Sequence, residues 1–226
     1  MITLHGQTYI PPKANRLEKL VVLIHGYGAS GDNLLDLSYH WQDSLPNAVF
    51  AAPNGPETCD VNPSGYQWFG LPDLSPVNIR LGLDRAGPVL QNYLQNLMTT
   101  YQLAPQDVAL VGFSQGAILA LDMMFLMPTL AGVIGYSGVF LPPKNRPLSP
   151  PLTKALLVHG TLDTVVPYSA FIHAEAALKD HGISFETHTC HGLDHSISPD
   201  GIQVGRDFLS QVLSSSIKTQ GAAYGS

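Results

Sequence analysis

Short apolar runs alternate along the chain with longer segments in which apolar residues recur every three or four positions. Several runs are apolar on both faces, as parallel strands covered on both sides are. They predict strands over residues 19–25, 47–53, 108–113, 131–137, 154–160 and 184–190. The longer segments predict helices over residues 32–45, 79–102, 115–127, 168–182 and 200–213. Gly87-Pro88 is expected to start or kink the second helix.

This alternation predicts an α/β fold with a mostly parallel central sheet and helices on both faces. Residues 2–10 are expected to add an antiparallel edge strand. We expect residues 1–215 to form a single domain. The small, polar residues 216–226 are expected to be a flexible tail, either a frayed terminus or an addition to the natural chain.

The segment 53–78 interrupts the alternation with many Pro, Gly and Asn residues and no clear period. A loop of this length in a compact domain is usually functional or disordered. Its large apolar residues Trp68, Phe69 and Leu71 argue against disorder, because such side chains normally pack against something. We therefore expect a functional, lid-like loop.

Composition narrows the possible functions. Hydrophobic residues make up 45% of the 226 residues and charged residues only 12%, which is typical of a globular protein with much buried surface. A net charge of −6 with only 11 Lys and Arg argues against a nucleic-acid partner.

The expected cellular location follows from three features: membrane spans, signal peptides and disulfides. No apolar run reaches the roughly 18 residues of a membrane span, and the first 13 residues do not resemble a signal peptide. Two cysteines, Cys59 and Cys190, do not make a disulfide framework, so free thiols in a cytoplasmic protein are expected.

Residues 112–116, Gly-Phe-Ser-Gln-Gly, fit the pattern G-x-S-x-G between a predicted strand and a predicted helix. That context is the one a nucleophile elbow requires, because a tight turn between two glycines exposes the serine hydroxyl at a helix N-terminus. Ser114 is therefore the candidate nucleophile. Ser137, in the segment GYSGV, also ends a strand but lacks a second glycine at the right spacing and a following helix, so it is interpreted as structural.

A serine hydroxyl needs a base to remove its proton. In hydrolases with this elbow the partners follow in the order Ser, Asp or Glu, His. Asp163 follows the strand 154–160 and His195 follows the strand 184–190, so both should reach the edge of the sheet that carries Ser114. Asp194 is less suited, because neighbouring residues are poorly placed to orient each other.

Other histidines are rivals for the role of base. His188 and His191 fit packed positions within or at the end of a strand, and His25 and His159 are expected to hydrogen-bond the loops that follow them. The cluster at 188–195, HTCHGLDH, also invites a metal site. Its spacing fits no standard zinc pattern, and we expect no metal.

An oxyanion hole needs two donors. The backbone N–H of Gln115 supplies one, and the glycine-rich loop LIHGYGASGDN supplies the other, with Tyr27 as the expected donor. A dinucleotide-binding loop is the alternative, but no acidic residue ends a second strand about 20 residues on.

With these segments together, the chain resembles the carboxylesterase and acyl-protein thioesterase family of α/β-hydrolases over about residues 19–213. The segments that carry the resemblance are LIHGYGASGDN, AAPNGP, WFG, GFSQGA, LAGVIGYSGVF, HGTLDTVVP and GLDHSIS. The resemblance implies the α/β-hydrolase fold and hydrolysis of esters or thioesters without a cofactor. It also implies a triad of Ser114, Asp163 and His195 and an oxyanion hole from Tyr27 and Gln115.

In the family, the loop of Trp68 and Phe69 corresponds to the acyl-binding and lid region, and we expect Leu71 and Val166 to contact the substrate as well. Members that act on lipidated proteins often have leucine at the position of Tyr27, and SWFD where this chain has QWFG. These departures favour a small or medium acyl ester or thioester as substrate. Lysophospholipase or acyl-protein thioesterase activity is the alternative, and a ligand-binding pseudo-hydrolase is a third. A monomer or weak homodimer is expected.

Overall fold

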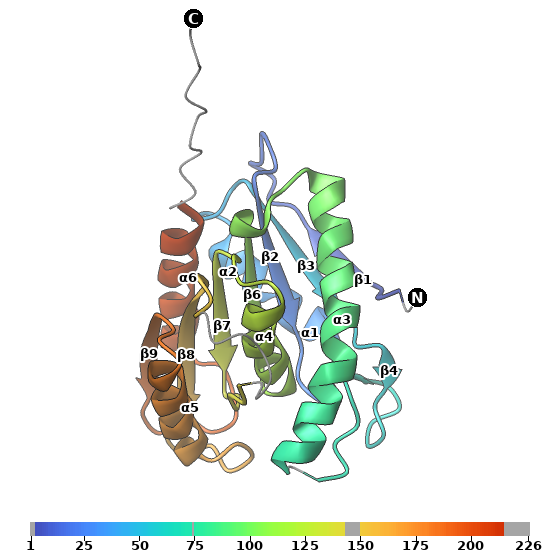
Figure 1. The fold of residues 1–226 in the computed structure, drawn as a ribbon. Helices are drawn as coiled ribbons and strands as arrows, with labels where there is room; N and C mark the ends of the chain where they lie inside the picture. The colour runs from blue at the N-terminus through green and yellow to red at the C-terminus, as the bar shows by residue number, and fades with distance from the viewer. Residues whose placement is uncertain (1–2, 74, 143–149, 215–226) are drawn as a thin grey trace, which may run out of the picture.

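Seven strands form one sheet in the computed structural model, which describes residues 3–73, 75–142 and 150–214 (Figure 1). Their order is β1-β3-β2-β6-β7-β8-β9. β1 pairs with β3 antiparallel, and every other neighbouring pair is parallel. In sheet order the strands are β1 (Gly6–Tyr9), β3 (Ala48–Pro53), β2 (Lys19–Ile24), β6 (Val108–Phe113), β7 (Gly132–Tyr136), β8 (Lys154–Gly160) and β9 (Phe185–Cys190). The mostly parallel sheet and its antiparallel edge strand are confirmed.

Helices cover both faces of the sheet, as Figure 1 shows. The helices on one face are α3 (Pro76–Tyr101), α4 (Gln115–Leu126) and α5 (Tyr168–Asp180), and those on the other are α1 (Asp32–Leu35), α2 (Leu37–Trp41) and α6 (Pro199–Ser214). A short 3-10 helix, Pro105–Asp107, precedes β6. Successive strand residues feed opposite cores: Leu110 packs with the first group of helices and Val111 with the second. This explains why the strands are apolar on both faces.

The long helix begins earlier than its sequence pattern predicts. Ser75 caps it by accepting a hydrogen bond from the Asn78 N–H at 3.3 Å, and Pro76 takes the first helical position, where a missing N–H costs nothing. Pro88 therefore lies inside α3 and does not start it. The predicted helix over 32–45 is also two short helices, α1 and α2.

The loop between β3 and α3 is folded onto the domain in its described part. It contains a small hairpin of β4 (Glu57–Thr58) and β5 (Tyr66–Gln67). Trp68 and Phe69 follow the hairpin, and each is only 1% exposed. A Cβ added to Gly82 of α3 would lie 2.2 Å from the Phe69 ring, so this glycine makes room for the loop. Trp68 and Phe69 are therefore packed against the domain, as predicted, whereas the predicted tail 216–226 lies outside the described residues.

Candidate active site

Ser114 lies in the turn between β6 and α4, with backbone angles φ 54° and ψ −118°. A positive φ is unfavourable for a residue with a side chain. The turn is held by the Ser114 N–H, which donates to the Tyr136 carbonyl at 2.9 Å. Ser114 is thus fixed where the strand ends and the N-terminus of α4 begins, which is the geometry predicted for an elbow.

Two glycines make this turn possible. A Cβ on Gly112 would lie 2.3 Å from the Gly116 carbonyl oxygen, and a Cβ on Gly116 would lie 1.9 Å from that of Ile24. Real Cβ atoms do not approach backbone oxygens so closely. The two outer positions of G-x-S-x-G are therefore glycine for steric reasons, because strand and helix cross without room for a methyl group.

Asp163 and His195 follow the carboxyl ends of β8 and β9, which are neighbouring parallel strands. The His195 Nδ1 lies 2.7 Å from Asp163 Oδ2. The other carboxylate oxygen, Oδ1, accepts the N–H groups of Val165 at 2.9 Å and Val166 at 2.8 Å. The carboxylate is thus fixed on one side by its own loop and on the other by the imidazole.

These contacts keep Asp163 ionised. Burial alone would raise the pKa of its carboxyl, but the hydrogen bonds from His195, Val166 and Val165, with the charge attraction of His195, outweigh burial and hold the pKa below its usual value of 3.8. A carboxylate at this place favours the His195 tautomer with its proton on Nδ1. The free Nε2 is then a base.

The imidazole of His195 lies beside the elbow. Its ring centroid is 4.8 Å from that of Phe113, the residue directly before Ser114. His195 therefore bridges the Asp163 carboxylate and the segment that carries the serine. The structure thus joins two of the three residues predicted for the triad, Asp163 and His195, and places the His195 ring beside the residue that precedes Ser114.

Two rival histidines bond backbone carbonyls, whereas His191 is exposed and not packed as predicted. His25 Nδ1 bonds the Gly26 carbonyl at 2.7 Å, and His159 Nε2 bonds the Val166 carbonyl at 2.8 Å. Both bond the loops that follow them, as predicted. His159 also approaches Asp163 Oδ2, at 3.4 Å, a contact that the sequence does not indicate.

The oxyanion candidates flank the serine. A Cβ on Gly26 would lie 3.3 Å from Ser114 Cβ, so the backbone leading into Tyr27 lies close to the serine. Gln115 is the first residue of α4, where the backbone N–H has no partner within the helix. Both N–H groups that sequence reasoning selects thus belong to segments adjoining Ser114.

The Tyr27 side chain lies against the long loop. Burial raises the pKa of its hydroxyl to about 12, aided by Cys59 and Asp60 and opposed by a hydrogen bond to the Leu71 backbone. The residue therefore joins the oxyanion segment to the long loop on both sides of β5.

The four expected substrate contacts fall into two groups. Leu71 and Val166 are partly exposed, whereas Trp68 and Phe69 belong to the buried core. Sequence reasoning missed the reason for this burial: the Gln115 side chain, itself 1% exposed, hydrogen-bonds the backbone of both aromatic residues. A glutamine directly after the nucleophile was the only signal, and it says nothing about a loop about 46 positions away.

His188, Cys190 and Asp200 offer one nitrogen, one sulfur and one oxygen within 4.8 Å of one another, the one such group among residues 3–73, 75–142 and 150–214. These atoms already have partners: His188 Nε2 lies 3.0 Å from Asp200 Oδ2, and Ser198 donates to the Cys190 sulfur at 3.3 Å and also bonds Asp200. Burial raises the pKa of the Cys190 thiol, which disfavours the thiolate that a metal needs. The group is accounted for as a hydrogen-bonded network.

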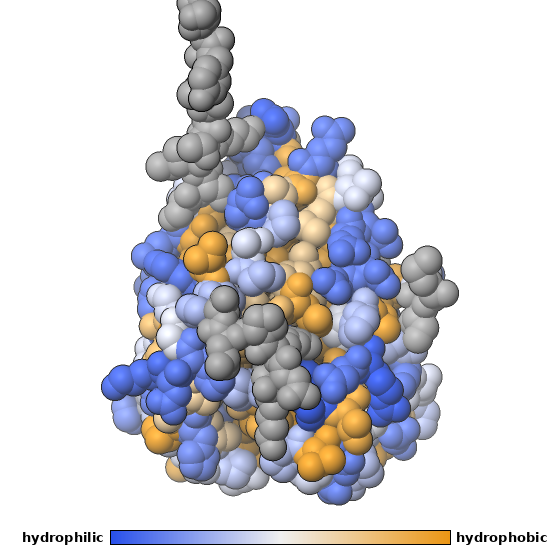
Figure 2. Space-filling view, viewed as in Figure 1, coloured by the Kyte–Doolittle hydropathy of each residue, from blue (hydrophilic) through white to orange (hydrophobic). Residues whose placement is uncertain are grey.

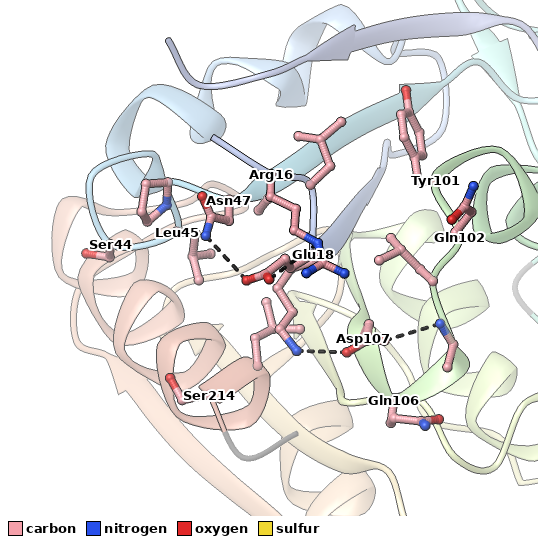
Figure 3. Close-up of a pocket in the computed structure, with 17 residues that line it drawn as sticks. Arg16, Glu18, Ser44, Leu45, Asn47, Tyr101, Gln102, Gln106, Asp107 and Ser214 are labelled. Atoms are coloured by element: carbon pink, nitrogen blue, oxygen red, sulfur yellow. Dashed lines mark hydrogen bonds and ion pairs between the residues drawn. The ribbon is translucent and has the colours of Figure 1, made fainter. Parts of the chain in front are cut away.

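A hollow of about 1040 Å³ lies at the end of the sheet where the parallel strands begin, opposite to the end that carries Ser114 (Figure 3). It is lined by residues at the amino ends of β2, β3 and β6, among them Lys19, Ala48 and Asp107, and Lys19 and Asp107 form an ion pair there at 2.8 Å. Ser114, Asp163 and His195 follow the carboxyl ends of their strands, where ligands bind in such sheets. This hollow is therefore separate from the candidate site.

An elbow serine, a histidine beside it and a carboxylate behind the histidine on this sheet define the α/β-hydrolase class. The phospholipase/carboxylesterase family model matches residues 5–213. Esterase YpfH of Escherichia coli (strain K12) is 27% identical over 194 residues, covering 85% of this chain and 82% of its own. Acyl-protein thioesterase 1 homolog 1 of Dictyostelium discoideum is 26% identical over 230 residues, covering 93% and 98%.

Among solved structures, that of esterase PE8 superposes with a TM-score of 0.86 and 37% sequence identity, covering 94% of this chain and all of that one. The chain belongs to the phospholipase/carboxylesterase family. It is accordingly a carboxylic ester hydrolase. In the part of the chain that the structure describes, we find no helix with the length and apolarity needed to cross a membrane.

Proposed function

We propose that the chain hydrolyses esters of small to medium acyl groups through an acyl-enzyme formed on Ser114. The observation that carries this proposal is the 2.7 Å contact between Asp163 and His195, with the His195 ring against the residue that precedes Ser114. A serine needs a nearby base, oriented by a carboxylate, to become a nucleophile at neutral pH, and these contacts supply an oriented imidazole next to the segment that carries Ser114.

The three triad residues divide the work of the proposed cycle. Ser114 Oγ attacks the acyl carbonyl while His195 Nε2 takes its proton, and Asp163 stabilises the imidazolium through Nδ1–H. The proton then passes to the leaving alcohol, whose bond to the acyl carbon breaks. Water, activated by the same histidine, releases the acid and restores Ser114.

The tetrahedral intermediates carry a negative oxygen. We assign its stabilisation to the backbone N–H groups of Tyr27 and Gln115, since both segments adjoin Ser114. The N-terminus of α4 adds a favourable dipole at the same point. Such preorganised donors are usually the largest single contribution to catalysis in acyl transfer.

The preference for an apolar acyl group is supported by the surroundings of the site. Asp163 lies between Leu162 and Val165, which are 62% and 56% exposed, and Leu71 and Val166 are partly exposed. Val77, in the first turn of α3, is 68% exposed, and Figure 2 shows apolar side chains at the lower end of that helix. We propose that Leu71 and Val166 contact the acyl group and form an acyl wall. Trp68 and Phe69 support this wall from the buried side.

Thioester hydrolysis is a second candidate, because the Dictyostelium relative, matched over 98% of its length, is named an acyl-protein thioesterase. The same triad serves both leaving groups. An ester series from acetyl to palmitoyl, with the matching thioesters, tests the substrate proposal. We expect the highest kcat/KM at short or medium chain length, and a maximum at palmitoyl would favour a lysophospholipase or protein deacylase instead.

A further inference from the structure

The Gln115 side chain holds the long loop against the elbow. Its Oε1 accepts the Trp68 backbone N–H at 2.9 Å, and its Nε2 donates to the Phe69 carbonyl at 2.7 Å. The side chain is 1% exposed, so both bonds lie in a buried environment where leaving either partner unpaired is unfavourable. A primary amide of this length is needed, because one group must accept and donate at once.

Trp68 links the loop to a second backbone segment near Ser114, the one that contains His25. Its indole Nε1–H donates to the His25 carbonyl at 2.9 Å. His25 is followed directly by Gly26 and Tyr27, the segment that lies close to Ser114. Trp68 therefore lies between the two backbone segments to which the oxyanion donors are assigned.

His25 fixes the same segment from its other side. Its Nδ1 donates to the Gly26 carbonyl at 2.7 Å, and its Nε2 accepts the Gly55 N–H at 2.8 Å. Both nitrogens are used in a way that only the neutral ring allows, and burial lowers the pKa of His25 accordingly. The His25 carbonyl is thus a rigid anchor for the Trp68 indole.

We propose that the side chains of Gln115 and Trp68 are positioning residues that set the spacing between the Tyr27 and Gln115 N–H groups of the oxyanion hole. This inference rests on the proposed function. An oxyanion hole works only when both donors are 2.7–3.1 Å from the developing oxyanion. In this proposal the spacing of the two donors is set by the Gln115 side chain, which reaches from the elbow to Trp68, and by the Trp68 indole, which reaches to His25.

A purely structural role for these hydrogen bonds makes a different prediction. Structural loss lowers the stability of the fold and the amount of active enzyme, but each folded molecule still turns over normally. A positioning role lowers kcat in the folded enzyme, leaves KM nearly unchanged, and weakens an inhibitor that forms the oxyanion. The two roles therefore separate in kinetics that are normalised to titrated active sites.

Gln115→Met is the principal variant, because it keeps the length of the side chain and removes both hydrogen bonds. We expect kcat on p-nitrophenyl butyrate to fall roughly 10- to 100-fold, less than the loss of a whole donor, with KM changed by less than about threefold. The inhibition constant of an alkyl trifluoromethyl ketone, which forms a tetrahedral adduct on the serine, should rise by the same factor as kcat/KM falls.

Gln67→Met is the matched control. Gln67 is also a buried glutamine of the loop, 2% exposed, but it bonds only within the loop, accepting the Asp60 N–H at 3.0 Å and donating to Glu57 at 3.0 Å. Gln67→Met should lower the stability of the fold about as much as Gln115→Met does. It should keep kcat within about threefold, since the Gln67 side chain bonds the loop and not the elbow.

Trp68→Phe tests the second half of the connection and decides the matter if Gln115→Met does not fold. It removes the indole bond to His25 and should likewise lower kcat and weaken the ketone. Unchanged kcat and ketone inhibition in a folded Gln115→Met or Trp68→Phe enzyme, or an equal loss in Gln67→Met, would overturn the inference. Covalent labelling of the unmodified enzyme by a fluorophosphonate keeps the two proposals apart: without a label the proposed function fails, whereas with a label only the positioning role is at stake.

Discussion

His195 Nδ1 lies 2.7 Å from Asp163 Oδ2, although the two residues are 32 positions apart in the chain. The contact arises because β8 and β9 are parallel neighbours. The loops that follow them therefore start side by side, at the carboxyl ends of the strands. Asp163 is oriented by its own loop through the Val165 and Val166 N–H groups. The imidazole is thereby held before any substrate arrives.

Asp163→Asn should lower kcat by about 10⁴-fold, because the amide cannot hold the imidazole in the required tautomer or stabilise its charge. Steady-state hydrolysis of p-nitrophenyl butyrate measures this. Asp194→Asn is the matched control: Asp194 is adjacent to His195 but exposed, and its carboxylate bonds Ser196 at 2.6 Å. Comparable losses in the two variants would contradict the assignment of Asp163.

The depressed pKa of Asp163 predicts a particular acid dependence of stability. A carboxyl whose pKa is lower in the folded state stabilises the fold above its ordinary pKa of 3.8, and that contribution is lost as the pH falls through the folded-state value. Urea unfolding of the unmodified chain and of Asp163→Asn at a series of pH values measures it. The gap in unfolding free energy should narrow below about pH 4. A gap that persists or widens there would contradict the linkage.

Gly116→Ala should destabilise the fold by about 3 kcal/mol or more and abolish activity, because the new Cβ would meet the Ile24 carbonyl oxygen. Gly192→Ala is the control. Gly192 has a φ of 75° but nothing within 4 Å of an added Cβ, so it should cost only the roughly 1–2 kcal/mol of the left-handed conformation. Equal destabilisation of the two variants, measured by chemical denaturation, would count against the steric explanation of the elbow.

Leu71→Ala should extend the acyl preference toward longer chains, because it removes a partly exposed apolar side chain at the proposed acyl wall. We expect the ratio of kcat/KM for octanoyl to acetyl esters to rise by roughly tenfold, the lower end of the effect that one methylene group has in a hydrophobic pocket. Leu152→Ala, at an 82% exposed position that precedes β8, is the control. An unchanged ratio in Leu71→Ala would remove Leu71 from the proposed acyl contacts.

Much of the fold follows from local patterns in the sequence. The strands 108–113 and 154–160 agree with β6 and β8 at both ends, because each apolar run is bounded by polar or glycine residues. The start of α3 was missed because its cap, Ser75, lies in a stretch rich in turn-forming residues, while Gly87-Pro88 offers a stronger signal for a helix start. A proline inside a helix is tolerated where the surrounding tertiary contacts stabilise the helix.

The candidate site was predictable only where its residues follow strand ends. Ser114, Asp163 and His195 each come directly after or shortly after a parallel strand, so their meeting at one edge follows from topology. The contacts of the Gln115 side chain span 46 and 47 positions and join a helix start to an irregular loop. No periodicity specifies such contacts, so they had to be read from the structure.

The proposal that Ser114 is the nucleophile is tested most directly by intact mass and peptide mapping after reaction with a fluorophosphonate. A fluorophosphonate forms a stable phosphonyl adduct with a serine only where a base and an oxyanion hole activate it. The proposed mechanism predicts one adduct per chain, located on Ser114, with complete loss of esterase activity and no adduct on Ser114→Ala. An adduct on another serine with loss of activity, or a Ser114→Ala enzyme that retains hydrolysis within tenfold, would contradict it; the expected loss is roughly 10⁴- to 10⁶-fold.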